Sequence, residues 1–104
     1  MSIIQDVLKE EIERLEKNIS SYHNMLLSLP KGSIFVKQIG NICYAYRKYR
    51  DKDKIVSIYL GNIESEEVKK QIELNSEYRR IKSNILIAES ELKKLKKAYK
   101  AYGK

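Results

Sequence analysis

Aromatic and basic side chains alternate along residues 32–61, GSIFVKQIGNICYAYRKYRDKDKIVSIYLG. Tyrosine and phenylalanine rings can stack on bases, lysine and arginine neutralise phosphates, and a narrow β-ribbon can enter a major groove. Tyrosine and arginine are also favoured at protein interfaces, so composition leaves both classes of partner open. A third interpretation is an ordinary solvated strand face, because tyrosine favours strands. The chemistry open to this stretch is therefore binding.

Two turn signals divide this stretch into three predicted strands. The predicted strands cover residues 33–39, 42–50 and 55–60. Gly40-Asn41 suits a two-residue type II′ hairpin turn, and residues 51–54 form a polar four-residue loop. We therefore predict a three-stranded antiparallel meander over residues 33–60.

The turn lengths predict a register, and the register sorts the side chains between two faces. The predicted pairs are Ile39 with Ile42, Lys37 with Tyr44, Phe35 with Tyr46, Arg50 with Ile55, Lys48 with Ser57 and Tyr46 with Tyr59. An aliphatic face, expected to be core, carries Ile34, Val36, Cys43, Ala45, Val56, Ile58 and Leu60, with Arg47 and Tyr49 near its edge. The opposite side, the aromatic–basic face, carries Phe35, Lys37, Tyr44, Tyr46, Lys48, Arg50 and Tyr59. If the second loop had three or five residues, the side chains of the third strand would instead exchange faces.

Amphipathic helices are predicted on both sides of the meander, over residues 3–29 and 66–102. The first has an apolar seam of Leu8, Ile12, Leu15, Ile19, Tyr22, Leu26 and Leu29. The second has a seam of Tyr78, Ile81, Ile85, Ala88, Leu92, Leu95, Tyr99 and Tyr102. Both seams alternate steps of three and four residues, which is typical of coiled coils. Two such helices joined by a compact insert are expected to pack as an antiparallel pair.

The predicted fold class is α+β, with the order α-β-β-β-α. We expect an antiparallel two-helix coiled-coil hairpin with a three-stranded antiparallel β-meander at one end, in a single domain of residues 1–104. The second helix is longer than the first, and its excess around Val68, Ile72 and Leu74 is expected to cover the aliphatic face. A three-stranded sheet needs such a cover to be stable.

The net charge of +7 is concentrated in two blocks, residues 31–61 and 78–104. Such a charge favours an acidic partner. In an antiparallel helix pair, the acidic start of the first helix would partly neutralise the lysine-rich end of the second. Residues 93–100 are therefore either a second phosphate-contacting strip or a solvated helix end.

Catalytic and metal-binding patterns are not found in the sequence. The single histidine, His23, has no ligand or acid–base partner at a suitable spacing, and Cys43 is expected to be a small buried hydrophobe. We therefore predict a non-enzymatic protein without a metal site or cofactor. One cysteine permits no intrachain disulfide, and no apolar run of about 20 residues is present. The early charged residues lead us to expect no signal peptide. The expected location is the cytoplasm, with no membrane contact.

Three short motifs carry a resemblance to known proteins. They are Leu29-Pro30-Lys31-Gly32-Ser33, Tyr44-x-Tyr46-x-x-Tyr49-Arg50 and Tyr59-Leu60-Gly61. This core resembles short prokaryotic proteins of unassigned function that have an LPKGS start, a YxYxxYR strand and a YLG strand end between two helices. Many of these look like cargo of phages and other mobile elements. The resemblance implies the α-β-β-β-α order and a mobile-element origin, and it implies no activity.

Our leading hypothesis is a small nucleic-acid-binding protein of a phage or mobile element that uses the aromatic–basic face to bind DNA or RNA. The alternative is a protein-interaction module, such as a phage-encoded inhibitor (anti-CRISPR type) of a host defence nuclease. A third possibility is a purely structural coiled-coil dimer. Residues 85–88, with Val7 and Met25, widen the apolar helix faces, so a homodimer through the helical stalk is expected unless the sheet covers them.

Overall fold

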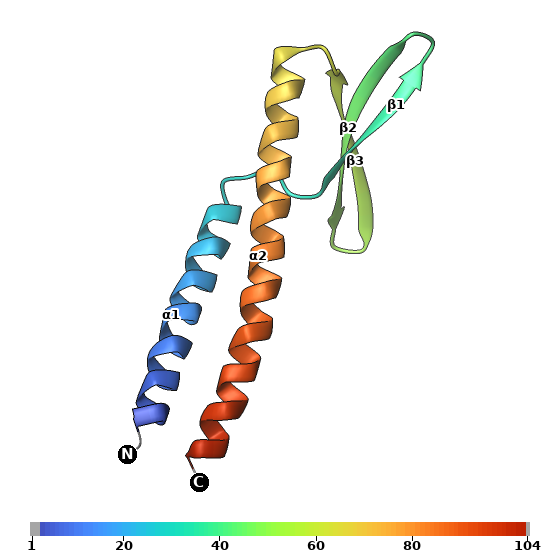
Figure 1. Cartoon of the computed structure of the whole chain (residues 1–104). Helices are drawn as coiled ribbons and strands as arrows, with labels where there is room; N and C mark the ends of the chain where they lie inside the picture. The colour runs from blue at the N-terminus through green and yellow to red at the C-terminus, as the bar shows by residue number, and fades with distance from the viewer. Residues whose placement is uncertain (1–2, 104) are drawn as a thin grey trace. The chain divides into compact units, whose positions relative to one another are not determined.

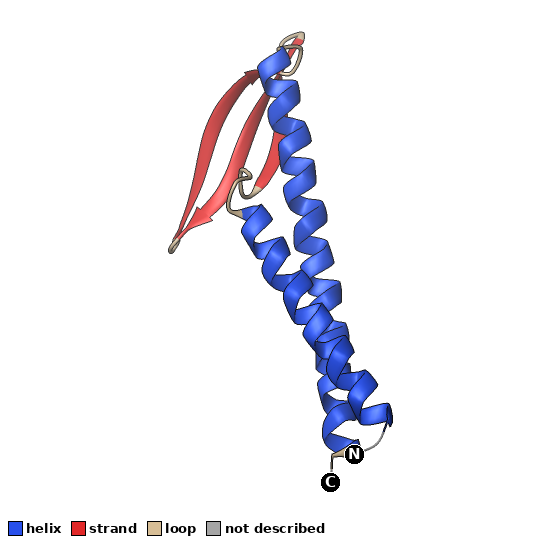
Figure 2. Ribbon diagram, turned by 90° about the vertical axis from the view of Figure 1, so that its left-hand side faces the viewer, coloured by secondary structure: helices blue, strands red, loops and turns tan. Residues whose placement is uncertain are grey.

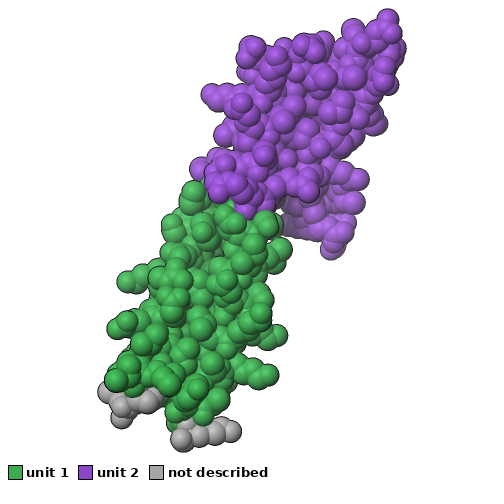
Figure 3. Space-filling view, viewed as in Figure 1, with its two compact units in different colours: residues 1–27, 81–104 green, residues 28–80 purple. Residues whose placement is uncertain are grey.

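The computed structural model describes residues 3–103 and has two helices and one three-stranded antiparallel sheet (Figure 1). The elements are α1 (Ile3–Leu26), β1 (Ser33–Ile39), β2 (Ile42–Asp51), β3 (Lys54–Asn62) and α2 (Glu66–Tyr102). The predicted α+β class and α-β-β-β-α order are confirmed. The chain divides into two compact units, one of residues 1–27 and 81–104 and the other of residues 28–80 (Figure 3). Helix α2 contributes residues to both units.

Helix α1 ends at Leu26, three residues before the predicted end. The residue before a proline avoids the α region, so Pro30 disfavours a helical Leu29. The chain already tightens at Leu27, whose N–H donates to the Asn24 carbonyl three residues back at 3.3 Å. Leu29, predicted as the last position of the seam, is therefore not helical.

The sheet has the strand order β1-β2-β3, and all six predicted residue pairs are present. At the first turn, Gly40 has a φ of 64°, the sign that a type II′ turn requires at its first central residue. At the second turn Asp51 pairs with Lys54, so only two residues connect β2 and β3. The prediction was a four-residue connection. Because both lengths are even, the side chains of β3 still point to the predicted faces of the sheet.

A β-bulge interrupts the pairing of β2 with β3. Tyr46 pairs with Tyr59 whereas its neighbour Ala45 pairs with Gly61, so Leu60 is the extra residue. Gly61 has a φ of 130°, a conformation that L side chains rarely adopt. The bulge was not predicted. It places Gly61 against α2, where a Cβ atom would lie 3.3 Å from Val68 Cγ2.

The core of the unit formed by residues 28–80 lies between α2 and the Ala45 side of the sheet. Ala45 is completely buried and Val68 is 2% exposed. Figure 2 shows the first turns of α2 on one side of the sheet. The predicted aliphatic face is thus the covered face, but only Ala45 of it is fully buried. Val36 on the edge strand β1 is 52% exposed. The others, including Cys43, which was expected to be buried, are only partly buried: Ile34, Cys43, Val56, Ile58 and Leu60. Ile72, expected to cover this face, is also exposed.

A buried asparagine joins the same unit across its core. Asn75 is 4% exposed, and its Nδ2 donates to the Gly32 carbonyl at 2.9 Å. This bond satisfies a side chain that would be costly to bury without a partner. Gly32 itself approaches β2 so closely that a Cβ atom would lie 2.2 Å from the Lys48 carbonyl oxygen. The start of β1 is therefore held between α2 and β2.

The unit formed by residues 1–27 and 81–104 consists of α1 and the second half of α2, which lie side by side in opposite directions (Figure 1). Its buried apolar residues are Leu15, Ile81, Ile85 and Ala88, all from the predicted seams. Lys96 Nζ lies 3.4 Å from Glu16 Oε2, an example of the predicted neutralisation between the helices. Tyr102, predicted as a seam residue, is exposed at the end of α2. Across residues 3–103, no helix has both the length and the apolar character that crossing a membrane requires.

The two positive-φ glycines on either side of β1, Gly32 and Gly40, provide a test of this packing. Gly32→Ala is expected to lower the free energy of unfolding by about 3 kcal/mol, because the strained φ adds to a clash with the β2 backbone. Gly40→Ala, which meets no atom within 4 Å, is expected to cost only about 1 kcal/mol. Urea unfolding of both variants measures the difference. Equal losses would contradict the close approach of Gly32 to β2.

Candidate functional site

Four aromatic side chains of the aromatic–basic face form one ring cluster. The rings of Phe35 and Tyr46, a cross-strand pair, are stacked with centroids 5.3 Å apart and planes 13° apart. Tyr59 on β3 meets Tyr46 edge to face at 5.4 Å, and its ring is tilted against Tyr44 at 6.0 Å. The register thus brings rings from all three strands together, as predicted.

Lys37 adds a positive charge to this cluster. Its Nζ lies 5.3 Å from the Tyr46 ring centroid and 5.9 Å from that of Phe35. Both distances are within the range of cation–π attraction. Five of the seven predicted site residues are therefore in direct contact with one another.

The remaining two cations, Lys48 and Arg50, lie on the same face but apart from the rings. Both are exposed, and alternation along β2 places them on the side of Tyr46. Among residues 3–103, no acidic side chain forms a salt bridge with Lys37, Lys48 or Arg50. The face therefore carries three cations without an acidic counterpart.

The arginines of the helices show the opposite behaviour. Arg14 Nε and Nη2 donate to the Glu11 carboxylate at 2.6 and 2.8 Å, and this hydrogen bonding lowers the pKa of Glu11. Arg80 pairs with Glu77 and lowers the pKa of Glu77 in the same way. Positive charge on the helices is thus partly neutralised nearby, unlike the charge on the aromatic–basic face.

The aromatic–basic face is the side of the sheet away from the first turns of α2. Ala45 is completely buried and has the opposite parity to Tyr44 and Tyr46 on β2. Its partner Gly61, beyond the bulge at Leu60, lies against Val68 of α2. Tyr59 is 57% exposed, and the other three rings are half-buried. The rings are therefore not packed beneath the helix.

Three exposed isoleucines extend this face, and the candidate site did not include them. Ile39 and Ile42 are paired at one end of the sheet, and Ile55 pairs with Arg50 towards the other. The predicted pairing already contained all three residues. Each lies an even number of residues from a predicted face residue on its own strand, and this alternation could have assigned all three to the face.

A second group of cations lies on the covered side of the sheet, around Tyr49. The Tyr49 ring has Lys31 Nζ 4.9 Å from its centroid and Arg47 Cζ 5.0 Å from it. Arg47 Nη1 also donates to the Lys31 carbonyl at 3.0 Å, whereas its buried Nε has no partner in the structure. Arg47 therefore fixes the chain entering β1. The sequence placed Arg47 and Tyr49 only near the edge of this side.

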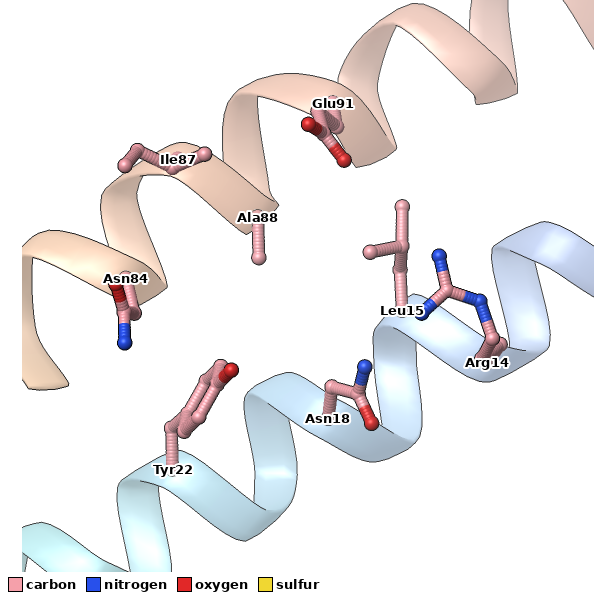
Figure 4. Close-up of a pocket in the computed structure, with 8 residues that line it drawn as sticks. All are labelled: Arg14, Leu15, Asn18, Tyr22, Asn84, Ile87, Ala88 and Glu91. Carbon is pink, nitrogen blue, oxygen red and sulfur yellow. The ribbon is translucent and has the colours of Figure 1, made fainter.

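Two further cavities offer polar linings without a reactive arrangement. One of about 290 Å³ lies beside β3 and is lined by Arg47, Tyr59, Leu60, Glu67, Val68 and Gln71. The other, of about 260 Å³, lies between α1 and the second half of α2 and is lined by Arg14, Leu15, Asn18, Tyr22, Asn84, Ile87, Ala88 and Glu91 (Figure 4). Within residues 3–103, no group of three or more His, Cys, Asp or Glu side chains is placed to hold a metal ion.

Residues 5–70 match the DUF6788 family, which is described as a domain of unknown function. The match covers more than half of the chain, so the chain belongs to this family. It includes α1 except its first two residues, the sheet with all seven residues of the aromatic–basic face, and the beginning of α2. Comparisons with curated proteins and with solved structures gave no match.

Substitutions of the central ring test how far the cluster stabilises the sheet. Tyr46→Ala is expected to lower the free energy of unfolding by about 2 kcal/mol, because it removes ring contacts with Phe35 and Tyr59 and a cation–π contact with Lys37. Tyr46→Phe keeps the ring and is expected to change stability by less than about 0.5 kcal/mol. Thermal and urea unfolding measure both. A Tyr46→Ala protein as stable as the parent would mean that the rings do not form a cluster in solution.

Proposed function

We propose that this member of the DUF6788 family is a non-enzymatic nucleic-acid-binding protein of a phage or other mobile element. The aromatic–basic face of its sheet would be the contact surface. One observation carries this proposal: the face joins three cations without acidic partners to a cluster of four rings, on the side of the sheet away from the first turns of α2.

The unpaired cations supply the electrostatic part of the proposal. A lysine or arginine that already pairs with a carboxylate must break that pair before it binds a phosphate. Lys37, Lys48 and Arg50 have no such pair to break. Each phosphate that they neutralise releases counterions, which favours binding most at low salt.

The rings supply a rigid polar and apolar surface between the cations. Mutual contact limits the freedom of Phe35, Tyr46 and Tyr59, so little further entropy is lost when a partner binds. The tyrosine hydroxyls can donate and accept hydrogen bonds. Cations and ordered hydroxyls together suit a polyanion that carries hydrogen-bonding bases.

The helical unit has a supporting part in the proposal. Its buried seam residues and the Lys96–Glu16 ion pair favour an antiparallel coiled-coil hairpin. Ile87 on α2 and Val7 on α1 remain exposed, which favours a homodimer through the helices. The proposed site of action is the cytoplasm, where a lone thiol such as Cys43 stays reduced.

One observation favours a different partner. The exposed isoleucines Ile39, Ile42 and Ile55 give the face an apolar component that phosphate binding does not need. Isoleucines beside tyrosines and an arginine also suit a protein interface. The second candidate function is therefore that of a protein-interaction module, such as a phage-encoded inhibitor (anti-CRISPR type) of a host defence nuclease.

Salt dependence separates these two functions. If Lys37, Lys48 and Arg50 each neutralise one phosphate, the logarithm of the DNA association constant should fall with the logarithm of salt concentration with a slope of about −3. Arg50→Ala should reduce the slope by about one unit, and Lys69→Ala on α2 is the matched control. Fluorescence anisotropy with labelled DNA and RNA measures the slope. Absence of salt-dependent binding, together with nuclease-resistant capture of one protein partner, would favour the alternative.

Light scattering tests the proposed dimer separately. The chain has a mass of 12.2 kDa, so a homodimer should scatter as a particle of twice that mass. Ile87→Lys, which places a charge at an exposed apolar position of α2, should shift the population towards the monomer. A parent protein that is monomeric at high concentration would exclude the dimer and leave the nucleic-acid proposal unchanged.

A further inference from the structure

We infer that the aromatic–basic face binds B-form duplex DNA across the major groove, in preference to single strands and to A-form RNA. The inference rests on the proposed function and adds the form of nucleic acid that the face fits. It depends on two separate observations, the mutual contact of the rings and the positions of the cations on either side of them.

Base stacking on single strands requires ring faces that are free to receive a base. The Phe35 and Tyr46 rings are instead stacked on each other at 5.3 Å, with only 13° between their planes. Tyr59 and Lys37 also contact Tyr46, at 5.4 and 5.3 Å from its centroid. A base could stack at the centre of the cluster only after these contacts were broken.

Rings that contact one another across strands leave their edges as the surface open to a partner. Tyr44, Tyr46 and Tyr59 all belong to this cluster and each carries a hydroxyl group. Hydroxyls can bond to base edges in a groove, and ring edges can lie against the methyl group of thymine. The cluster therefore suits the reading of a groove better than the stacking of unpaired bases.

The cations lie on both sides of the ring row, measured along the strands. Lys37 pairs with Tyr44, on one side of the Phe35–Tyr46–Tyr59 row, and Lys48 lies on the other side. Four residues along β2 separate the backbone levels of these two lysines, which are therefore about 13 Å apart. The Lys37 Nζ lies 5.3 Å from the Tyr46 centroid, so this cation–π contact opens when Lys37 extends to a phosphate on its own side of the row. Arg50 lies two residues beyond Lys48, at about 20 Å from the level of Lys37.

This spacing fits two phosphate backbones with a groove between them. The B-form major groove is about 12 Å wide, so Lys37 can reach one backbone while Lys48 and Arg50 reach the other. The ring row then lies over the base edges. The minor groove, about 6 Å wide, is too narrow for this arrangement, and the major groove of A-form RNA is deep and narrow. A single strand offers only one backbone.

The first experiment compares four ligands at one salt concentration. Fluorescence anisotropy measures binding of the full chain to a 20-base-pair DNA duplex, to each of its strands, and to an RNA duplex of the same sequence. The duplex DNA is expected to bind at least about tenfold more tightly than the others. Equal or tighter binding of a single strand or of the RNA would overturn this inference but leave the proposed function standing. Absence of binding to all four ligands would contradict both this inference and the proposed function.

A competition experiment tests the groove. Methyl green occupies the major groove and netropsin fills the minor groove, so only methyl green should displace the protein from duplex DNA. Displacement by netropsin alone would overturn the inference while still showing that the protein binds DNA.

Two variants test whether cations on both sides of the ring row contribute. Lys37→Gln and Lys48→Gln should each reduce the salt slope for duplex DNA by about 0.9, and the double variant by about 1.8. Lys69→Gln on α2 is the charge-matched control and should leave the slope unchanged. A double variant no weaker than either single variant would contradict contact with both backbones. Circular dichroism of each variant checks that the fold is retained.

Discussion

The hydrogen bond from Asn75 to the Gly32 carbonyl is the constraint on which the sheet unit depends. It is made by a buried polar side chain, so losing it would leave an unsatisfied group in the core. Gly32 lies against the Lys48 carbonyl at a distance that no side chain permits. The start of β1 is thus held from two sides, by α2 and by β2. Because side chains alternate along a strand, holding one face of the sheet against α2 leaves the rings and cations on the other.

That separation gives the two faces different electrostatics. On the covered side, Arg47 is occupied by the Lys31 carbonyl and the Tyr49 ring. On the aromatic–basic face, Lys48 and Arg50 have no acidic partner among the described residues, although unpaired like charges repel one another. On the helices, the same kind of charge is paired, as between Arg14 and Glu11. Charge left unpaired on one face while it is paired elsewhere is what a binding surface for an anion requires.

The sequence was sufficient to predict the strands and the side chains on each face of the sheet, because turn length and alternation are local properties. Two connections of even length determined six residue pairs, and Gly40 marked the first turn. The bulge at Leu60 was missed because turn length and alternation do not indicate an extra residue within a strand. Asn75 was missed because its partner, Gly32, is 43 residues away. The end of α1 was placed three residues too late, because the seam spacing continues to Leu29 whereas the chain already turns at Leu27.

The ring cluster shows how stability and binding can depend on the same contacts. Phe35, Tyr46 and Tyr59 stabilise three strands by contacting one another, and the facing sides of the stacked Phe35 and Tyr46 rings are closed to a base. A protein partner would use the isoleucines at the ends of the face, whereas a duplex would use the three cations. The two functions therefore depend on different residues of one surface, and charge substitutions that leave the rings in place can distinguish them.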